Sequence, residues 1–324
     1  MNEIIVNYIA FLLQTITIVA AILIVLGKII SLKRSSKLGD SDIEIKKLNT
    51  KRQESIEKTA KEILSKKEYK KLIKSNKEQQ KKDKNKRKHK LFILDFKGDI
   101  RASAAEQLRE EISAILAIAS KNDQVLLQLE SPGGCVHDYG FAASQLTRIR
   151  NCDIKLTVAV DKMAASGGYL MACVANNIIA SPFAVIGSIG VLLQVPNFHK
   201  FLQDKKINFE QLTSGNDKRN LTLFTENTKE DREKAQEQID QIHRLFIDFV
   251  KKYRPNIEAD KVATGKTWHA IDAIGLNLVD QITTSDDFII TAMKTNDVYM
   301  ITKHKKKKKL AQKITENAQM LLSI

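Results

Sequence analysis

The chain has 324 residues and a formal net charge of +15, with 53 lysine and arginine residues against 38 aspartate and glutamate residues. This length suits one large domain or two ordinary ones. The basic residues concentrate in residues 33–90 and 303–324, whereas the region between them is mildly acidic. A nucleic-acid enzyme would carry its basic surface on the fold itself, so this distribution argues against a nucleic-acid partner and favours anionic membrane lipid.

The three cysteines are Cys135, Cys152 and Cys173. Their spacing matches neither a metal site nor a disulfide framework, so we expect no metal and no cofactor. All three fall in predicted core elements, where we expect small buried apolar side chains.

Residues 4–27 contain no charged side chain. As a helix this stretch would reach about 36 Å, enough to cross a bilayer with some tilt. A cleaved signal peptide is the alternative, but Glu3 precedes the apolar run and no small-residue cleavage site follows it. We therefore predict an uncleaved single-pass transmembrane anchor over residues 1–30; the family resemblance described below implies that it lies in the cell inner (plasma) membrane. The basic flank that follows would place the rest of the chain in the cytoplasm.

Residues 31–90 are rich in lysine and poor in large apolar side chains. Too little can be buried for a core, which predicts a solvated linker, partly helical or disordered. A folded domain is expected over residues 91–300, and a basic C-terminal tail over residues 301–324.

Strand and helix patterns alternate through the folded domain. Strands are predicted at residues 91–96, 124–129, 154–160 and 177–180, and helices at residues 103–119, 134–150 and 167–175. This alternation predicts an α/β fold with a parallel sheet and βα crossovers. Ligand sites in such sheets lie at the carboxyl ends of the strands.

Ser166 lies in a small-residue turn between the strand at 154–160 and the helix at 167–175. A serine at such a junction is exposed beside the amides of the first helical turn, as in a nucleophile elbow, although Ala164 stands where the usual pattern has glycine. The alternative is a tight turn that happens to contain serine.

A second turn, Ser131-Pro132-Gly133-Gly134, follows the strand at 124–129. Its glycines free the following amides to point outward. The amides of Gly134 and Gly167 could therefore converge on one oxyanion. The alternative is a purely structural turn.

A serine nucleophile needs a base. None of the six histidines follows Ser166 at a strand position that returns it to the site, and His243 lies in the middle of a predicted helix. A lysine base must be neutral, which requires its pKa to fall by about 3 units from about 10.4. Lys218, in the loop at residues 215–221, is the candidate; a solvated loop lysine is the alternative.

Several segments together resemble the signal peptide peptidase A (SppA) family of serine proteases, in particular its single-unit inner-membrane members. They are residues 131–134, 161–169, 180–182, 187–191, 215–223, 263–268 and 275–280. The resemblance implies a crotonase-like (Clp protease-like) fold and assembly into a homo-oligomeric ring.

The resemblance also implies a Ser/Lys dyad, with Ser166 as nucleophile and Lys218 as general base. Ser188 matches the serine that hydrogen-bonds the lysine amine, and Gly134 matches the oxyanion glycine. The sequence departs from the family at Asp217, where aromatic residues are frequent. An adjacent carboxylate favours the charged amine and opposes the shift that a base needs.

We therefore expect a membrane-anchored serine endopeptidase, whose serine peptidase domain spans residues 91–300. Its substrates would be extended peptides, such as signal-peptide remnants or membrane and exported proteins. The alternatives are a catalytically inactive oligomeric scaffold at the membrane and a crotonase-type acyl-CoA enzyme. The family resemblance suggests that the folded domain lies on the periplasmic face, whereas the basic flank suggests the cytoplasmic face, so the side of the membrane stays open.

A long amphipathic helix is predicted at residues 228–253. It offers an apolar face to the core or to another subunit.

Overall fold

The computed structural model describes residues 13–15, 17, 43–83, 89–215, 218 and 221–303. The chain divides into two compact units, one formed by Ile43–His304 and the other by Met1–Asp42 with Lys305–Ile324. Every strand and every helix named below belongs to the unit Ile43–His304.

The predicted anchor over residues 1–30 lies almost wholly outside the described residues, as does the basic tail after Lys303. Within the ranges that are described, no helix is both long enough and apolar enough to span a bilayer. The anchor therefore stays a prediction.

A seven-stranded sheet forms the centre of the fold, in the order β1-β10-β2-β3-β4-β6-β9. Only the pairing of β1 with β10 is antiparallel; the other five pairings are parallel. The sheet is therefore mixed, and the α/β class is confirmed. Its strands are β1 (Ile43–Lys47), β2 (Lys90–Lys97), β3 (Gln124–Glu130), β4 (Lys155–Val160), β6 (Asn177–Ala180), β9 (Gln281–Ile282) and β10 (Asp297–Lys303).

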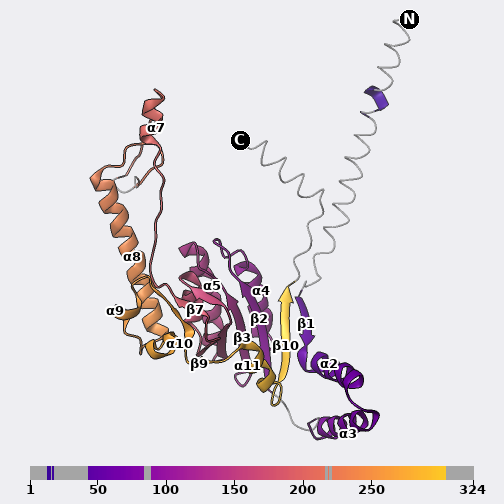
Figure 1. Ribbon diagram of the computed structural model, residues 1–324. Helices are drawn as coiled ribbons and strands as arrows, with labels where there is room; N and C mark the ends of the chain where they lie inside the picture. Colours follow the sequence, from indigo (N-terminus) through magenta and orange to yellow (C-terminus); the bar gives the residue numbers. More distant parts are fainter. Residues whose placement is uncertain are drawn as a thin grey trace, which may run out of the picture. The chain divides into compact units, whose positions relative to one another are not determined.

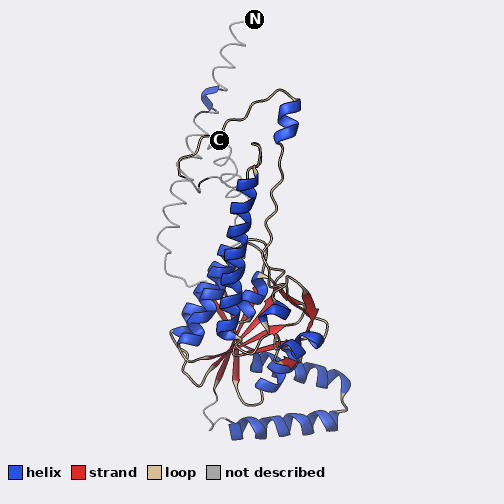
Figure 2. Ribbon diagram, turned by 90° about the vertical axis from the view of Figure 1, so that its left-hand side faces the viewer, coloured by secondary structure: helices blue, strands red, loops and turns tan. Residues whose placement is uncertain are grey.

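Helices cover both faces of this sheet (Figure 2). Alternate residues of β2 point to opposite faces. Phe92 and Leu94 join the core cluster that includes α4 (Ala105–Leu116), α5 (Val136–Asn151) and α6 (Gly167–Ala172). Leu91 and Ile93 join a second cluster, against which α11 (Ser285–Ala292) packs. Burial on both faces explains why the predicted strands read as continuous apolar runs.

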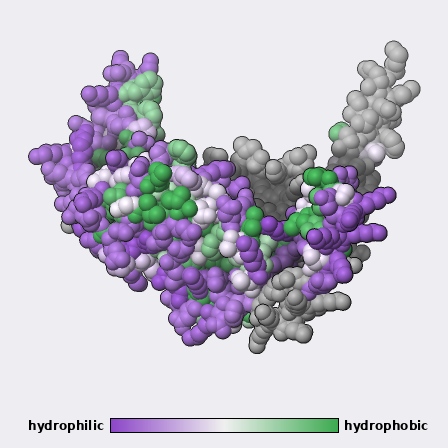
Figure 3. Space-filling model, turned by 60° about the horizontal axis from the view of Figure 1, so that its bottom comes forward, coloured by the Kyte–Doolittle hydropathy of each residue, from purple (hydrophilic) through white to green (hydrophobic). Residues whose placement is uncertain are grey.

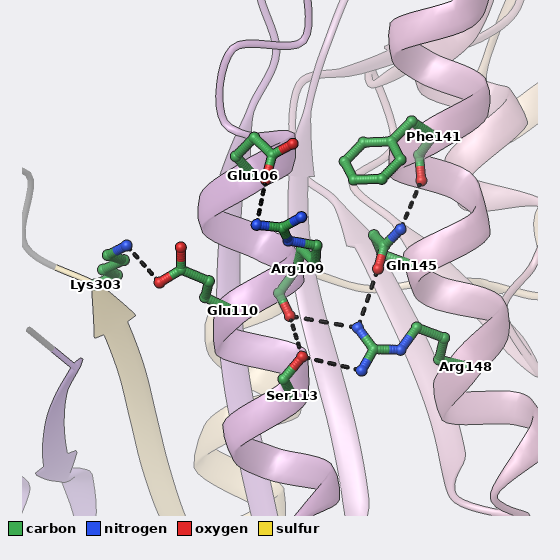
Figure 4. A network of polar contacts seen from close by, with 8 residues as sticks. All are labelled: Glu106, Arg109, Glu110, Ser113, Phe141, Gln145, Arg148 and Lys303. Carbon is green, nitrogen blue, oxygen red and sulfur yellow. Dashed lines mark hydrogen bonds and ion pairs between the residues drawn. The ribbon is translucent and has the colours of Figure 1, made fainter. Parts of the chain in front are cut away.

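Polar contacts join helix α4 to helix α5 (Figure 4). Arg148 of α5 donates to Ser113 Oγ of α4 over 2.9 Å and to Gln145 Oε1 over 3.0 Å. At the other side of α4, Lys303 pairs with Glu110 and so ties β10 to the same helix. These contacts hold α5, and therefore the turn that precedes it, against the sheet.

A second sheet has three short strands in the order β5-β7-β8. These are β5 (Met163–Ala165), β7 (Val185–Gly187) and β8 (Thr267–His269). A parallel bridge between Ser131 and Ala164 joins β5 to the residue that follows β3. The small sheet therefore lies at the carboxyl ends of the central strands, where a ligand site is expected.

The segment predicted to be a solvated linker also contributes to the fold. It contains β1, α2 (Leu48–Ile63) and α3 (Lys66–Asp83). Asn49 accepts a hydrogen bond from the Val298 amide over 2.7 Å, and Leu48 packs on the second core cluster. The helices agree with the expected partial helicity, whereas a strand in the central sheet was not expected. The predicted domain boundaries stay a prediction.

The described part of residues 191–228, namely 191–215, 218 and 221–228, extends away from the sheet after β7. It carries the short helix α7 (His199–Asp204), which lies far from the central sheet (Figure 1). The chain returns along α8 (Lys229–Tyr253), which confirms the predicted long helix and starts at a capping box of Thr228 and Asp231. We call residues 191–228 the excursion. Several of its apolar side chains are exposed, among them Leu192, Phe201 and Leu212. Figure 3 shows that apolar patches interrupt a mainly hydrophilic surface.

The expectation of three buried cysteines is wrong for two of them. Cys173 is buried, but Cys135 and Cys152 are exposed. They flank α5 as its N-cap and C-cap residues, and helix ends lie nearer the surface than the middle of a packed face.

Candidate active site

Ser166 lies between β5 and α6, with φ 51° and ψ −119°. This backbone conformation is rare for any residue except glycine and is found where surrounding contacts enforce it. The Ser166 amide donates to the Gly187 carbonyl over 2.8 Å, and its carbonyl accepts from Leu170 in the first turn of α6. The strand-to-helix turn is present as predicted, although the strand before it is β5 rather than β4. The Ser166 side chain is half-buried there.

The turn Ser131–Gly134 lies directly against the Ser166 turn. The Ser131 amide donates to the Met163 carbonyl over 2.8 Å, and the Ala165 amide donates to the Ser131 carbonyl over 3.0 Å. A Cβ on Gly133 would lie 2.7 Å from Ser166 Cβ, and Gly133 has φ 89°. Only glycine fits there. The expected convergence of the two turns is observed, and Gly133 is the glycine that permits it.

The predicted oxyanion residues are Gly134 and Gly167. Among the described residues, neither of their amides has a hydrogen-bond acceptor, whereas the Gly133 amide donates to Ser131 Oγ over 3.1 Å. A Cβ on Gly134 would lie 2.1 Å from the Ile100 carbonyl oxygen. Two unpaired amides near a nucleophile are what an oxyanion hole needs. Their role stays a prediction.

A buried chain of hydroxyl groups supports the Ser131 turn. Ser131 Oγ lies 2.6 Å from Tyr139 Oη, and Tyr139 Oη donates to the Asp99 carbonyl over 2.8 Å. Burial raises the pKa of Tyr139, so its hydroxyl stays protonated and can donate. The Tyr139 ring also packs against Gly167, whose added Cβ would lie 2.4 Å from Tyr139 Cγ. One side chain therefore contacts both turns.

Ser166 and Ser188 line one cavity of about 630 Å³. Ser188 follows β7, has φ 53°, and its amide donates to the Lys266 carbonyl over 2.8 Å. The other lining residues come from the segment after β7, from α8 and from the loop before β8: Gly190, Val191, Leu192, Gln236, Ile239, Asp240, His243, Ala263, Thr264 and Gly265. The two predicted serines are therefore brought together, at the carboxyl ends of the central strands.

Lys218 is not among the residues that line this cavity. It is exposed on the excursion, where its amide donates to the Gly215 carbonyl over 3.1 Å. The fold of this single chain therefore unites Ser166, Ser188 and the two glycine turns, but does not bring Lys218 to them.

Three polar residues that α8 contributes to the cavity were not predicted: Gln236, Asp240 and His243. His243 was set aside as a base because it lies mid-helix, yet the middle of α8 is the part that passes the cavity. The spacing 236, 240, 243 places the three on one helical face, which was a usable signal. Within the described ranges, no group of three or more histidine, cysteine or carboxylate side chains could hold a metal ion.

Comparison with known proteins identifies the family. The sequence profile of "Peptidase family S49 N-terminal" matches residues 3–146, and that of "Peptidase family S49" matches residues 148–299. The chain therefore belongs to peptidase family S49.

Within this family the chain is similar to proteins called SohB. It is 45% identical to the probable protease SohB of Haemophilus influenzae, over 98% of this chain and 94% of that protein. It is 56% identical to the probable protease SohB of Buchnera aphidicola subsp. Schlechtendalia chinensis, over 62% of this chain and 66% of that protein. These relatives agree with the predicted family and support a SohB-type peptidase.

Among solved structures, the 1510-N membrane-bound stomatin-specific protease in complex with a substrate peptide is similar at 15% identity and a TM-score of 0.46. The match covers 71% of this chain and 99% of that chain.

Proposed function

We propose that this S49 peptidase is a membrane-anchored serine endopeptidase that cleaves peptide bonds with Ser166 as nucleophile and Lys218 as general base. The observation that carries the proposal is the strained Ser166 turn, which lines a cavity and lies against the Ser131–Gly134 turn. Sequence resemblance to the SppA family supports the lysine and a crotonase-like fold.

The reaction would run through an acyl-enzyme. Ser166 Oγ attacks the peptide carbonyl while the Lys218 amine takes its proton, and the amides of Gly134 and Gly167 donate to the oxyanion. Collapse of the tetrahedral intermediate breaks the C–N bond, and the lysine ammonium protonates the leaving amine. Water then hydrolyses the ester by the same steps in reverse order. Ser188 would accept a hydrogen bond from the lysine amine.

The base has to enter the cavity, because a lysine in water stays charged and cannot accept a proton. We propose that a second copy of the chain supplies Lys218 in a homo-oligomeric ring. The exposed apolar side chains of the excursion, such as Phe201 and Leu212, support an assembly that covers them. The proposed anchor over residues 1–30 would hold this ring at the inner membrane, beside membrane lipid and substrates such as signal-peptide remnants or exported proteins.

Fluorophosphonate labelling tests the nucleophile. The wild-type protein should label and hydrolyse peptides, whereas Ser166→Ala should do neither. Lys218→Ala should keep its fold and lose hydrolysis. Absence of both labelling and hydrolysis in the wild type would favour an inactive scaffold, and binding of coenzyme A would favour an acyl-CoA enzyme.

Mixing tests the source of the base. Ser166→Ala and Lys218→Ala proteins, each inactive, are dissociated and reassembled together. If the base comes from a neighbour, about a quarter of the interfaces join an intact Ser166 to an intact Lys218, so about a quarter of wild-type activity should return. No recovery in a mixed ring would refute a base supplied between copies.

A further inference from the structure

The wall of the cavity formed by α8 carries a row of polar side chains. Gln236 and Asp240 are one turn apart, and His243 follows on the same face. Gln236 Nε2 donates to Asp240 Oδ1 over 2.8 Å and so orients the carboxylate. Asp240 forms no ion pair with any residue that the structure describes. The row therefore presents a carboxylate with free acceptor capacity to whatever binds beside Ser166.

His243 adds a second unsatisfied group to the same wall. Its Nε2 is shielded from solvent and has no hydrogen-bond partner in the described part of the chain. Buried polar atoms without a partner are rare in native structures and call for an explanation such as a ligand. In the tautomer with the proton on Nδ1, Nε2 is an acceptor.

The rest of the lining is apolar or small, including Val191, Leu192 and Ile239. None of the described residues that line the cavity is a lysine or an arginine. The cavity thus combines apolar walls with acceptors and one negative charge. A long side chain with an aliphatic stem and a cationic head matches this combination.

We propose that the α8 wall is a substrate subsite that selects a lysine or arginine of the bound peptide. The stem packs along Val191 and Ile239, the cationic head pairs with Asp240, and His243 Nε2 accepts a further hydrogen bond. Asp240 is the specificity-determining residue. This inference rests on the proposed function, because it places the peptide in the cavity that holds Ser166.

A peptide library tests the subsite with the full-length protein in detergent. At one substrate position, the wild type should cleave peptides with lysine or arginine about two- to fivefold faster than the same peptides with glutamate, the range expected for one solvent-accessible ion pair. Asp240→Asn should bring that ratio close to one, and Asp240→Lys should invert it.

Asp248→Asn is the matched control, because Asp248 is an exposed carboxylate of the same helix that does not line the cavity. It should keep the wild-type ratio. A wild type without a basic preference would overturn the inference, and so would an equal change of the ratio in Asp240→Asn and Asp248→Asn.

Binding separates this inference from the proposed function. In a Ser166→Ala background, fluorescence anisotropy compares the affinity for a lysine-containing peptide with that for its glutamate analogue, with and without Asp240→Asn. A preference that Asp240→Asn removes supports the subsite even if Ser166 proves not to be the nucleophile. Equal affinities overturn the subsite even if Ser166→Ala abolishes cleavage.

Discussion

Tyr139→Phe is the most informative single substitution, because it deletes one oxygen atom and leaves the ring in place. That oxygen joins Ser131 Oγ to the Asp99 carbonyl, and Ser131 Oγ in turn accepts from the Gly133 amide. The substitution therefore loosens the turn that carries the proposed oxyanion amide, without creating a large cavity and without touching Ser166.

The magnitudes follow from these contacts. Two hydrogen bonds, one buried and one partly buried, are lost at about 1 kcal/mol each, so the free energy of unfolding should fall by about 2 kcal/mol. Loss of an oxyanion donor reduces the rate about 100- to 1,000-fold. Loosening rather than removing the donor should have a smaller effect, and we expect kcat to fall about tenfold with KM little changed.

Tyr169→Phe is the control for this experiment. Tyr169 is equally buried, but its hydroxyl donates to the Leu278 carbonyl, over 3.1 Å, and makes no contact with either turn. It should lose about 1 kcal/mol of stability and keep its kcat. Urea unfolding and initial rates on a fluorogenic peptide measure both quantities. If both variants lose stability and neither loses kcat, Tyr139 supports the fold and not the reaction.

Three further changes test other parts of the structure. Gly134→Ala should abolish hydrolysis while the folded protein persists, because the added Cβ would lie 2.1 Å from the Ile100 carbonyl and must displace the turn; near-normal rates would contradict this. Arg254→Met should lower the free energy of unfolding by about 2 kcal/mol in urea, since it leaves Asp280 without its bidentate partner; an unchanged midpoint would argue against that pair. Burial raises the pKa of Glu111 above its usual value of 4.5, so the folded state binds the carboxyl proton more tightly than the unfolded state. The contribution of Glu111 to the free energy of unfolding therefore falls as the pH rises above 4.5. Melting temperatures measured from pH 4 to pH 8 should therefore decline in the wild type relative to Glu111→Gln; parallel curves would refute the shift.

Strands β2 and β3 could be predicted because each is a long apolar run buried on both faces, as in Leu91–Phe96 and Val125–Leu129, whereas β9 and β10 were not predicted. The three strands of the small sheet have three residues each, too few for a periodic signal. β1 was hidden in a lysine-rich segment, and only its pairing with β10 makes it a strand. Such pairings join residues that are far apart in the sequence, so no local sequence pattern predicts them.

The candidate site also contains parts that could be predicted from the sequence and parts that could not. The Ser166 turn and the Ser131 turn are local glycine-rich signals that follow strands, and the topology of a parallel sheet brings such strand ends together. The α8 wall depends instead on where a distant helix crosses the strand ends, so His243 could not be placed from its position in the sequence. The assignment of Lys218 as the general base rests on family resemblance, and its place in catalysis stays a prediction.

The small sheet explains how Ser166 keeps its strained backbone. A conformation of this kind costs about 1–3 kcal/mol and persists only where neighbours hold it on several sides. The Ser166 amide is held by Gly187 of β7, the preceding Ala165 amide by Ser131, and the Ser166 carbonyl by the first turn of α6. β7 also leads into Ser188, so one short strand fixes both serines of the cavity. The Ser166 turn is therefore built by β5 and β7, and the bridge between Ser131 and Ala164 joins these two strands to the end of β3.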